Sequence, residues 1–292
     1  LQQTRRRRLL QAARDRVPLD VAGRVVDHLG GDGEAGVEAG RPGERRDLSL
    51  IHADKGAWLL LSQPDDHSRL VVRQIDAAGR MEIAADDHLH PHDLLPTAKS
   101  VVVFFIPFKK ELIKENKKGE HPCRNWGVAY VQTNDLIGRL SQALGDFLTD
   151  NGFKSALMPA THNFDEDKLM ARWSHKHLAH LVNLGRFGVH HMLITPVGCT
   201  GRLGSLVSEA DLGNHPLIET EEACLLKVGK TCGKCIEACP VEALGENDFE
   251  RRRCWGRLND NRRSLEYLSD LPESTHVCGK CAAMMPCSFN NP

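Results

Sequence analysis

The string CGKCIEACP at residues 232–240 contains Cys232, Cys235 and Cys239 in a C-x2-C-x3-C-P pattern. The two-residue gap lets a tight turn present two thiolates to one metal cluster. The three-residue gap carries the third thiolate onto a helical turn that points away, and Pro240 prevents a simple continuation. In bacterial ferredoxin-type runs the cysteine before the proline ligates the other of two clusters. The pattern therefore predicts two clusters and further cysteine ligands elsewhere in the chain.

The remaining ligands are present in the same part of the chain. None of the 10 cysteines precedes Cys123, and eight lie between Cys224 and Cys287. Eight thiolates match two [4Fe–4S] clusters with four ligands each. The pseudo-twofold arrangement of ferredoxins predicts one cluster at Cys224, Cys232, Cys235 and Cys287. The same arrangement predicts the other at Cys239, Cys254, Cys278 and Cys281.

Two other uses of these cysteines are open at this point. Pairs of C-x2-C also build zinc sites with four thiolates, but zinc ribbons do not require the x3-C-P extension. Disulfides are rare in cytoplasmic proteins. Cations near the ligands in sequence would favour the reduced state of an anionic cluster, or would simply be solvated. They are Lys227, Lys230, Lys234, Arg251, Arg252, Arg253 and Lys280.

Upstream of the cysteines, strands and helices alternate. The apolar run at 100–107 predicts a buried strand, and residues 155–158, 192–195 and 203–207 predict further strands. Asn134 is a suitable N-cap for a helix that ends at Asn151-Gly152, and Ser174 for one that ends at Gly185. We therefore expect an α/β domain at 93–218 and a cysteine-rich module at 219–292.

Residues 1–92 have a different composition. Lys55 and Trp58 are the only lysine and the only aromatic residue before residue 95, whereas arginine is frequent. The segment is either a separate basic or regulatory extension, or a poorly ordered and even non-native leader. We expect short strands at 58–61 and 70–72 and assign no function to them.

The charge balance excludes some classes of protein. The chain of 292 residues has 38 basic and 39 acidic side chains and a net charge of -1, which argues against a protein that coats nucleic acid or an anionic membrane. No apolar run is long enough for a transmembrane helix. The arginines at 5–8 are not followed by the apolar stretch of a twin-arginine signal, so we expect a cytoplasmic protein.

Residues 93–292 resemble the epoxyqueuosine reductase and reductive dehalogenase superfamily. The resemblance is carried by Ala238-Cys239-Pro240 and Arg253-Cys254 in the cysteine region, and by residues 94–103, 184–188 and 204–209 upstream. It implies an α+β nitroreductase-like layer with a C-terminal ferredoxin-like double [4Fe–4S] module. It also implies a base-off corrinoid such as cobalamin between the two parts, which receives single electrons from the clusters.

The sequence departs from the family pattern in several places. Seven residues separate Cys224 from Cys232, where the family has a more compact string, and Pro286 precedes Cys287 instead of following it. No helical-repeat tail of the kind that grips tRNA follows. Asp165 and Asp167 lie near the position of the family's catalytic acid, but the local match is too poor to transfer that role. The catalytic residues and the residues that would bind a corrinoid are therefore not assigned.

Two functions follow from these features. One is a reductase that passes single electrons through two clusters to a substrate or corrinoid site, supplied by a low-potential donor such as ferredoxin or flavodoxin. Its substrate would be a small molecule or a tRNA, with no membrane partner. The other is an electron-transfer or reductive-activation protein that serves a partner and has no substrate of its own.

A few other residues offer weaker signals. Histidines at 175, 177, 180, 190 and 191 would donate protons or contact a corrinoid, or serve structural roles. Cys199 is a nucleophile candidate without a readable base, and Cys123 is expected to be an ordinary thiol. Glycines near Gly185 and Gly201 would let a planar cofactor approach the backbone, or would only serve tight turns.

Overall fold

The central element of the fold is a four-stranded antiparallel sheet. A computed structural model describes residues 50–53, 56–59, 71–76, 87–160, 164–212 and 221–292. The strands are β3 (Val71–Asp76), β4 (Ser100–Pro107), β10 (Gly201–Ser208) and β5 (Ser155–Met158), and they lie in the order β3-β4-β10-β5. All three neighbouring pairs are antiparallel, so a mixed helix and sheet architecture is confirmed and its sheet is antiparallel.

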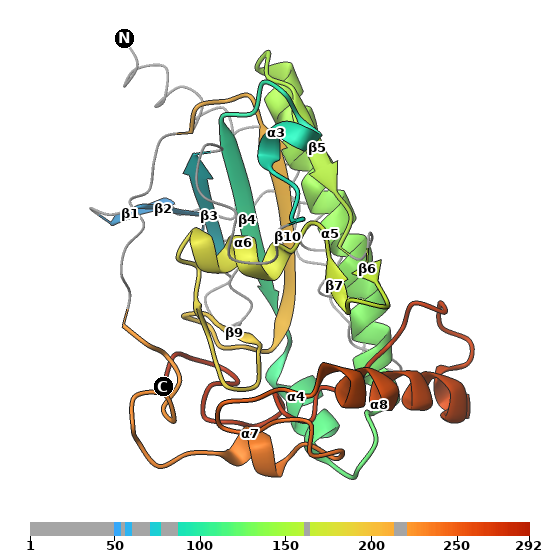
Figure 1. Ribbon diagram of the computed structural model, residues 1–292. Helices are drawn as coiled ribbons and strands as arrows, with labels where there is room; N and C mark the ends of the chain where they lie inside the picture. Colours follow the sequence, from blue (N-terminus) through green and yellow to red (C-terminus); the bar gives the residue numbers. More distant parts are fainter. Residues whose placement is uncertain (1–49, 54–55, 60–70, 77–86, 161–163, 213–220) are drawn as a thin grey trace, which may run out of the picture.

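Helices cover both faces of this sheet (Figure 1). Successive β4 side chains point to opposite faces. Val102 packs with Leu206 and Leu148, and Leu148 belongs to the long helix α5 (Arg124–Asp150). Val101 and Val103 instead pack with Leu178 of the short helix α6 (His175–Leu181). The predicted strand at 100–107 is confirmed, and burial on both faces explains its continuous apolar run.

Two helix boundaries differ from the prediction. The long helix begins at Arg124, so Asn134 lies inside it, where its Oδ1 accepts hydrogen bonds from the Arg202 guanidinium. The predicted end is right, since Asn151 is the C-cap and Gly152 has a φ of +81°. Ser174 does cap α6, but the helix ends at Leu181 because Asn183 enters the left-handed region at a φ of +59°.

In the part of the chain that the structure describes, three small antiparallel pairs lie outside the main sheet. They are β1 (Leu50–Ala53) with β2 (Gly56–Leu59), β6 (Phe164–Asp165) with β7 (Met170–Ala171), and β8 (Arg186–Phe187) with β9 (Leu193–Ile194). Two short helices complete this part, α3 (Pro91–Leu94) and α4 (Lys110–Lys117).

Strands also occur in the region expected to be a leader. Strand β2 overlaps the expected strand at 58–61, and β3 overlaps the one at 70–72. β3 pairs with β4 from Val71 opposite Phe105 to Asp76 opposite Ser100. Part of residues 1–92 therefore forms an edge of the main sheet. The remaining expectations for residues 1–49 lie outside the described residues.

The C-terminal segment lies at the end of the sheet where β4 ends and β10 begins (Figure 1). It contains the helices α7 (Lys234–Glu237) and α8 (Arg251–Ser264) and the 3-10 helix η1 (Glu266–Leu268), joined by loops. Leu268 and Val277 of this segment pack on Trp126 of α5 and Ile113 of α4. Within the described residues, no helix combines the length and the apolar character needed to cross a membrane.

Candidate metal centre

Four of the predicted ligands line one hollow. Its walls come from the segment after β8, from the cysteine string and from the C-terminal tail. Cys224 and Cys235 are buried there, and Cys232 and Cys287 are half-buried. Burial, together with the nearby Cys287, Cys224 and Cys232, raises the pKa of Cys235 to about 11. We call Cys224, Cys232, Cys235 and Cys287 the first thiol set.

Local backbone structure positions the first thiol set. Glu222 Oε1 accepts hydrogen bonds from the amides of Ala223 and Cys224, which fixes the start of this segment. Gly233 has a φ of +134° and lets the chain turn directly into α7, which carries Cys235. The Cys287 carbonyl accepts from the Cys199 amide at 2.9 Å, so the last thiol is attached to the loop before β10.

The other four predicted ligands form a second set, which we define as Cys239, Cys254, Cys278 and Cys281. Burial, together with the nearby Cys278 and Cys239, raises the pKa of Cys254 to about 11. Burial also raises the pKa of Cys281, with further contributions from Cys278, Cys254, Cys239 and, last, Cys235. Cys281 also packs against the buried cluster that contains Cys224 and Cys235, so the two thiol sets lie next to each other.

Hydrogen bonds fix the second thiol set and join its loop to the end of α4. The Ala243 amide donates to Cys239 Sγ at 3.2 Å. Lys280 is only 4% exposed, and its ammonium donates to the carbonyls of Asn116 and Lys118 at 2.6 and 2.9 Å. The Asn116 side-chain amide donates to the Cys278 carbonyl at 2.9 Å. The end of α4 is thereby attached to the loop that carries two of the predicted ligands.

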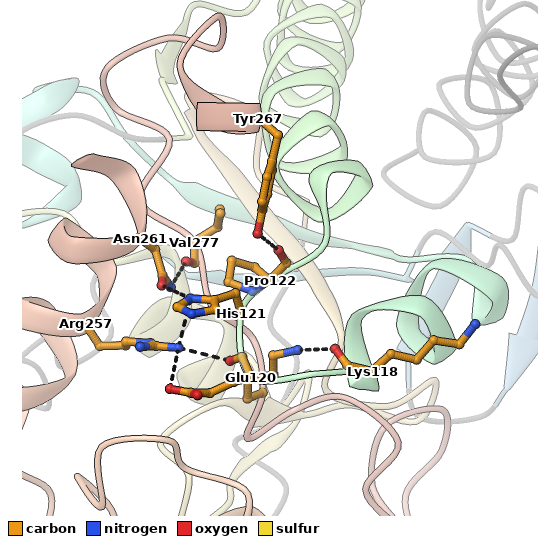
Figure 2. A network of polar contacts seen from close by, with 9 residues as sticks. Lys118, Glu120, His121, Pro122, Arg257, Asn261, Tyr267 and Val277 are labelled. Atoms are coloured by element: carbon orange, nitrogen blue, oxygen red, sulfur yellow. Dashed lines mark hydrogen bonds and ion pairs between the residues drawn. The ribbon is translucent and has the colours of Figure 1, made fainter. Parts of the chain in front are cut away.

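A second polar network attaches α8 to the loop between α4 and α5 (Figure 2). Arg257 donates to the Glu120 carbonyl at 3.1 Å and to His121 Nδ1 at 3.2 Å. Asn261 is buried, and its amide donates to the Val277 carbonyl at 2.9 Å, just before Cys278. Since His121 Nδ1 accepts from Arg257, it has no proton to donate to Asn261 Oδ1, which lies 3.4 Å away.

The predicted cations have specific partners in several cases. Lys280 is buried, as described above, and Lys227 donates to the Phe187 carbonyl at 2.5 Å. Arg253 donates to the Glu242 carbonyl, and Arg252 to the Asp167 carbonyl. These side chains therefore fix loops near the cysteines by hydrogen bonds to backbone carbonyls, and they also carry positive charge.

A third constellation was not predicted. Atoms of His190, Cys199 and Cys287 lie within 4.8 Å of one another and could hold a metal ion. His190 Nε2 lies 3.4 Å from Cys287 Sγ, and Cys199 Sγ lies 3.9 Å from it. The hydrogen bond from Cys199, with a further one from His190, lowers the pKa of Cys287 to about 5, whereas the same contact raises the pKa of Cys199. Sequence spacing gave no signal, because the three residues come from distant segments.

The histidines of α6 have structural partners. His175 is buried, with its ring nitrogens 2.8 Å from Ser205 Oγ and 3.0 Å from the Pro159 carbonyl. Burial, followed by the nearby Lys176, lowers the pKa of His177 to about 4. His180 Nδ1 lies 3.3 Å from the Gly185 carbonyl. These contacts favour the structural interpretation of the three side chains.

Lys176 of α6 lies near the segment after β8 and near Arg251 of α8. Its ammonium donates to the His191 carbonyl at 3.2 Å and lies 5.6 Å from the centre of the Phe187 ring. Burial, followed by the nearby Arg251, lowers the pKa of Lys176 to about 8.

The glycines expected to leave room for a cofactor are explained by packing inside the protein. A Cβ at Gly185 would lie 2.4 Å from the Ile194 carbonyl oxygen. At Gly201 it would lie 2.3 Å from the Ile106 carbonyl oxygen, and at Gly204 2.4 Å from the Phe104 ring. The approach of neighbouring strands and rings therefore accounts for these glycines.

The remaining candidate residues have ordinary local roles. Asp165 Oδ1 accepts from the amides of Asp167 and Lys168 at 2.9 Å and closes a turn, while Asp167 is exposed. Burial raises the pKa of Cys123 to about 11, and this residue precedes α5. Neither feature indicates catalysis.

Comparison with known proteins identifies the architecture. No family model and no curated protein matches the chain. A structure of epoxyqueuosine reductase with an epoxyqueuosine-modified tRNA-Tyr stem loop matches at 18% identity and a TM-score of 0.51. The Bacillus subtilis epoxyqueuosine reductase matches at 17% identity with the same TM-score. The fold is that of epoxyqueuosine reductase.

The extent of this likeness is partial. Each of the two matches covers 74% of this chain, and the chain spans 61% of the length of each. A catabolic reductive dehalogenase in complex with 3-bromo-4-hydroxybenzoic acid matches at 15% identity, with a TM-score of 0.44, over 60% of this chain and 23% of its own. The two epoxyqueuosine reductase structures confirm the expected resemblance at the level of the fold.

Proposed function

We propose that the chain is an iron–sulfur redox protein similar to epoxyqueuosine reductase, which passes single electrons through two [4Fe–4S] clusters to a substrate or corrinoid site. The observation that carries the proposal is that Cys224, Cys232, Cys235 and Cys287 line one hollow, beside which Cys281 of the second thiol set packs. In this proposal the first thiol set holds one cluster and the second thiol set holds the other.

The chemistry of the donors fits iron–sulfur clusters. Burial raises the pKa of Cys235, Cys254, Cys278 and Cys281, so these thiols would not ionise at neutral pH on their own. A bound cationic metal stabilises the thiolate form and removes the mutual repulsion of neighbouring thiolates. Zinc would do the same, but the x3-C-P extension after Cys235 is typical of cluster ligation.

The protein part of the proposed function is to hold the ligands and exclude water. When bound, the clusters would supply low-potential one-electron storage. Hydrogen bonds from Lys280 and Asn116 would fix the loop of the second thiol set, and the Cys199 amide would fix Cys287. The neighbouring positions of Cys235 and Cys281 would keep the transfer between the clusters short.

The two functional parts would be an α/β layer at 93–218, joined by β3, and a double-cluster module at 219–292. We propose a low-potential donor such as ferredoxin or flavodoxin for the clusters. The corrinoid proposal rests on the fold resemblance, since the glycines near 185 and 201 have another explanation. A tRNA is a candidate substrate because a protein of similar fold binds a modified tRNA stem loop.

The function is tested by following electrons into and out of the protein. Anaerobically reconstituted chain is reduced with a low-potential donor, and two electrons per chain are expected, one for each cluster. Cobalamin is then added, and its absorption is followed for binding in the base-off form. Binding below about 10 µM with reduction of cobalt would support a reductase with an internal electron chain. Failure to bind, with intact uptake of two electrons, would refute the corrinoid site and leave an electron-transfer protein.

A further inference from the structure

The last cysteine of the first thiol set receives two side-chain contacts from the α/β part of the chain. His190 lies in the segment after β8, and Cys199 in the loop before β10. Their exposed fractions are 4% and 1%. His190 Nε2 lies 3.4 Å from Cys287 Sγ, and Cys199 Sγ lies 3.9 Å from it. Both contacts are therefore shielded from water, where hydrogen bonds have their greatest electrostatic effect.

The backbone determines which nitrogen of His190 carries the proton. The Met192 amide donates to His190 Nδ1 at 3.1 Å. Nδ1 must then present a lone pair, so a neutral ring carries its proton on Nε2. Nε2 is the nitrogen that faces Cys287. The ring is thus arranged as a donor to the sulfur.

Cys199 contacts Cys287 through both its backbone and its side chain. Its amide donates to the Cys287 carbonyl at 2.9 Å, which fixes the two residues against each other. Its S–H group is directed toward Cys287 Sγ. Gly198, immediately before it, allows this approach, since a Cβ there would lie 2.2 Å from the Ser288 carbonyl oxygen.

We propose that His190 and Cys199 donate hydrogen bonds to the Cys287 thiolate and thereby raise the reduction potential of the cluster held by the first thiol set. The inference rests on the proposed function, because it requires that cluster. The two residues are positioning residues, since they act through Cys287. An N–H or S–H donor withdraws negative charge from a ligating sulfur, and this stabilises the reduced, more negative cluster.

The test is a redox titration of the reconstituted full chain, followed by electron paramagnetic resonance. H190F removes the donor and keeps an aromatic ring in the site. At a fixed potential, the ratio of reduced to oxidised first cluster should fall about tenfold, equivalent to about 59 mV for one electron. The second cluster should not change, and iron and sulfide should stay at about eight each. H190Q, which retains an N–H donor, should recover part of the loss.

Two further variants make the result specific. C199A should shift the same cluster in the same direction by less, because S–H is the weaker donor, and it carries the test if H190F fails to fold. H92F is the control, since the exposed His92 ring lies in α3, stacks on the His90 ring at 4.9 Å and should affect neither potential.

Unchanged potentials in H190F and C199A, with both clusters present, would overturn the inference and leave the proposed function intact. A loss of about four irons from H190F would also overturn it, because His190 would then be a ligand or be needed for assembly. A wild-type chain without clusters would instead refute the proposed function.

Discussion

Cys239 follows Cys235 by one helical turn, yet its thiol lies with Cys254, Cys278 and Cys281. In the proposed assignment, the three-residue spacing of the C-x2-C-x3-C-P pattern turns Cys239 away from the first thiol set. Cys235 and Cys239, which are only four positions apart, would therefore ligate different clusters.

Cys239→Ser should therefore reduce the iron content of reconstituted protein from about eight to about four per chain. The signal of the cluster at the first thiol set should remain when the reduced protein is examined by electron paramagnetic resonance. Cys123→Ser is the matched control, because this half-buried thiol belongs to neither set and should leave about eight irons. Loss of the first cluster alone in Cys239→Ser would show that the ligand assignment is wrong.

His177 makes the stability of the fold depend on pH. Burial lowers its pKa from 6.5 to about 4 in the folded chain. Between these values the unfolded chain binds a proton that the folded chain does not, so stability falls as the pH decreases from about 6.5 to about 4.

His177→Phe should weaken this dependence while keeping the contact with the Phe187 ring, which lies 5.2 Å away. The check is the difference in free energy of unfolding between wild type and variant, measured by denaturant titration at several pH values. A difference that stays constant from pH 7 to pH 4 would contradict the role of His177.

At the level of elements, β3 is an edge strand whose backbone pairs with β4 over six residues. Its removal would leave the N–H and C=O groups of β4 without these partners and create an exposed sheet edge. We therefore expect deletion of residues 1–76 to lower the melting temperature and promote aggregation.

Deletion of residues 1–49 keeps all three N-terminal strands and is the matched control, with little expected effect on melting temperature or iron content. Light scattering measures the aggregation of both variants, and thermal unfolding measures their melting temperatures. Equal behaviour of the two deletions would mean that β3 contributes nothing to the sheet.

Lys280 joins two elements, the C-terminal end of α4 and the loop that carries Cys278 and Cys281. Lys280→Met would leave the carbonyls of Asn116 and Lys118 without their ammonium partner, at a cost of roughly 1–3 kcal/mol. Unfolding should become easier, and iron should be lost from the second thiol set first. Lys117→Met, at an exposed neighbouring position, should change neither property. Equal iron retention in both variants would contradict the bracing role of Lys280.

At the level of the whole molecule, local signals predicted local structure well. The apolar run of β4, the end of α5 and the cap of α6 follow from short stretches of sequence. The start of α5 does not, because Trp126 and Gly127 pack against Phe108 and Leu268 from other segments. Tertiary packing there outweighs the capping preference of Asn134.

The candidate site shows the same division. The eight candidate ligands could be predicted from the spacing of the cysteines, because cluster ligation would restrict the local turns. The contact of His190 and Cys199 with Cys287 could not, since it depends on how the loop before β10 meets the C-terminal tail. Two backbone contacts determine how these segments pack. Gly198 lies against the Ser288 carbonyl, and the Ser288 amide donates to the Met285 carbonyl.

The proposed function requires that the two thiol sets hold two [4Fe–4S] clusters, and metal analysis shows whether they do. The measurement is the content of iron, acid-labile sulfide and zinc in the full chain after strictly anaerobic preparation. We predict about eight irons and about eight sulfides per chain, with zinc far below one equivalent. About two zinc ions per chain with little iron and no sulfide would contradict the account, because the same eight thiolates would then form two zinc sites.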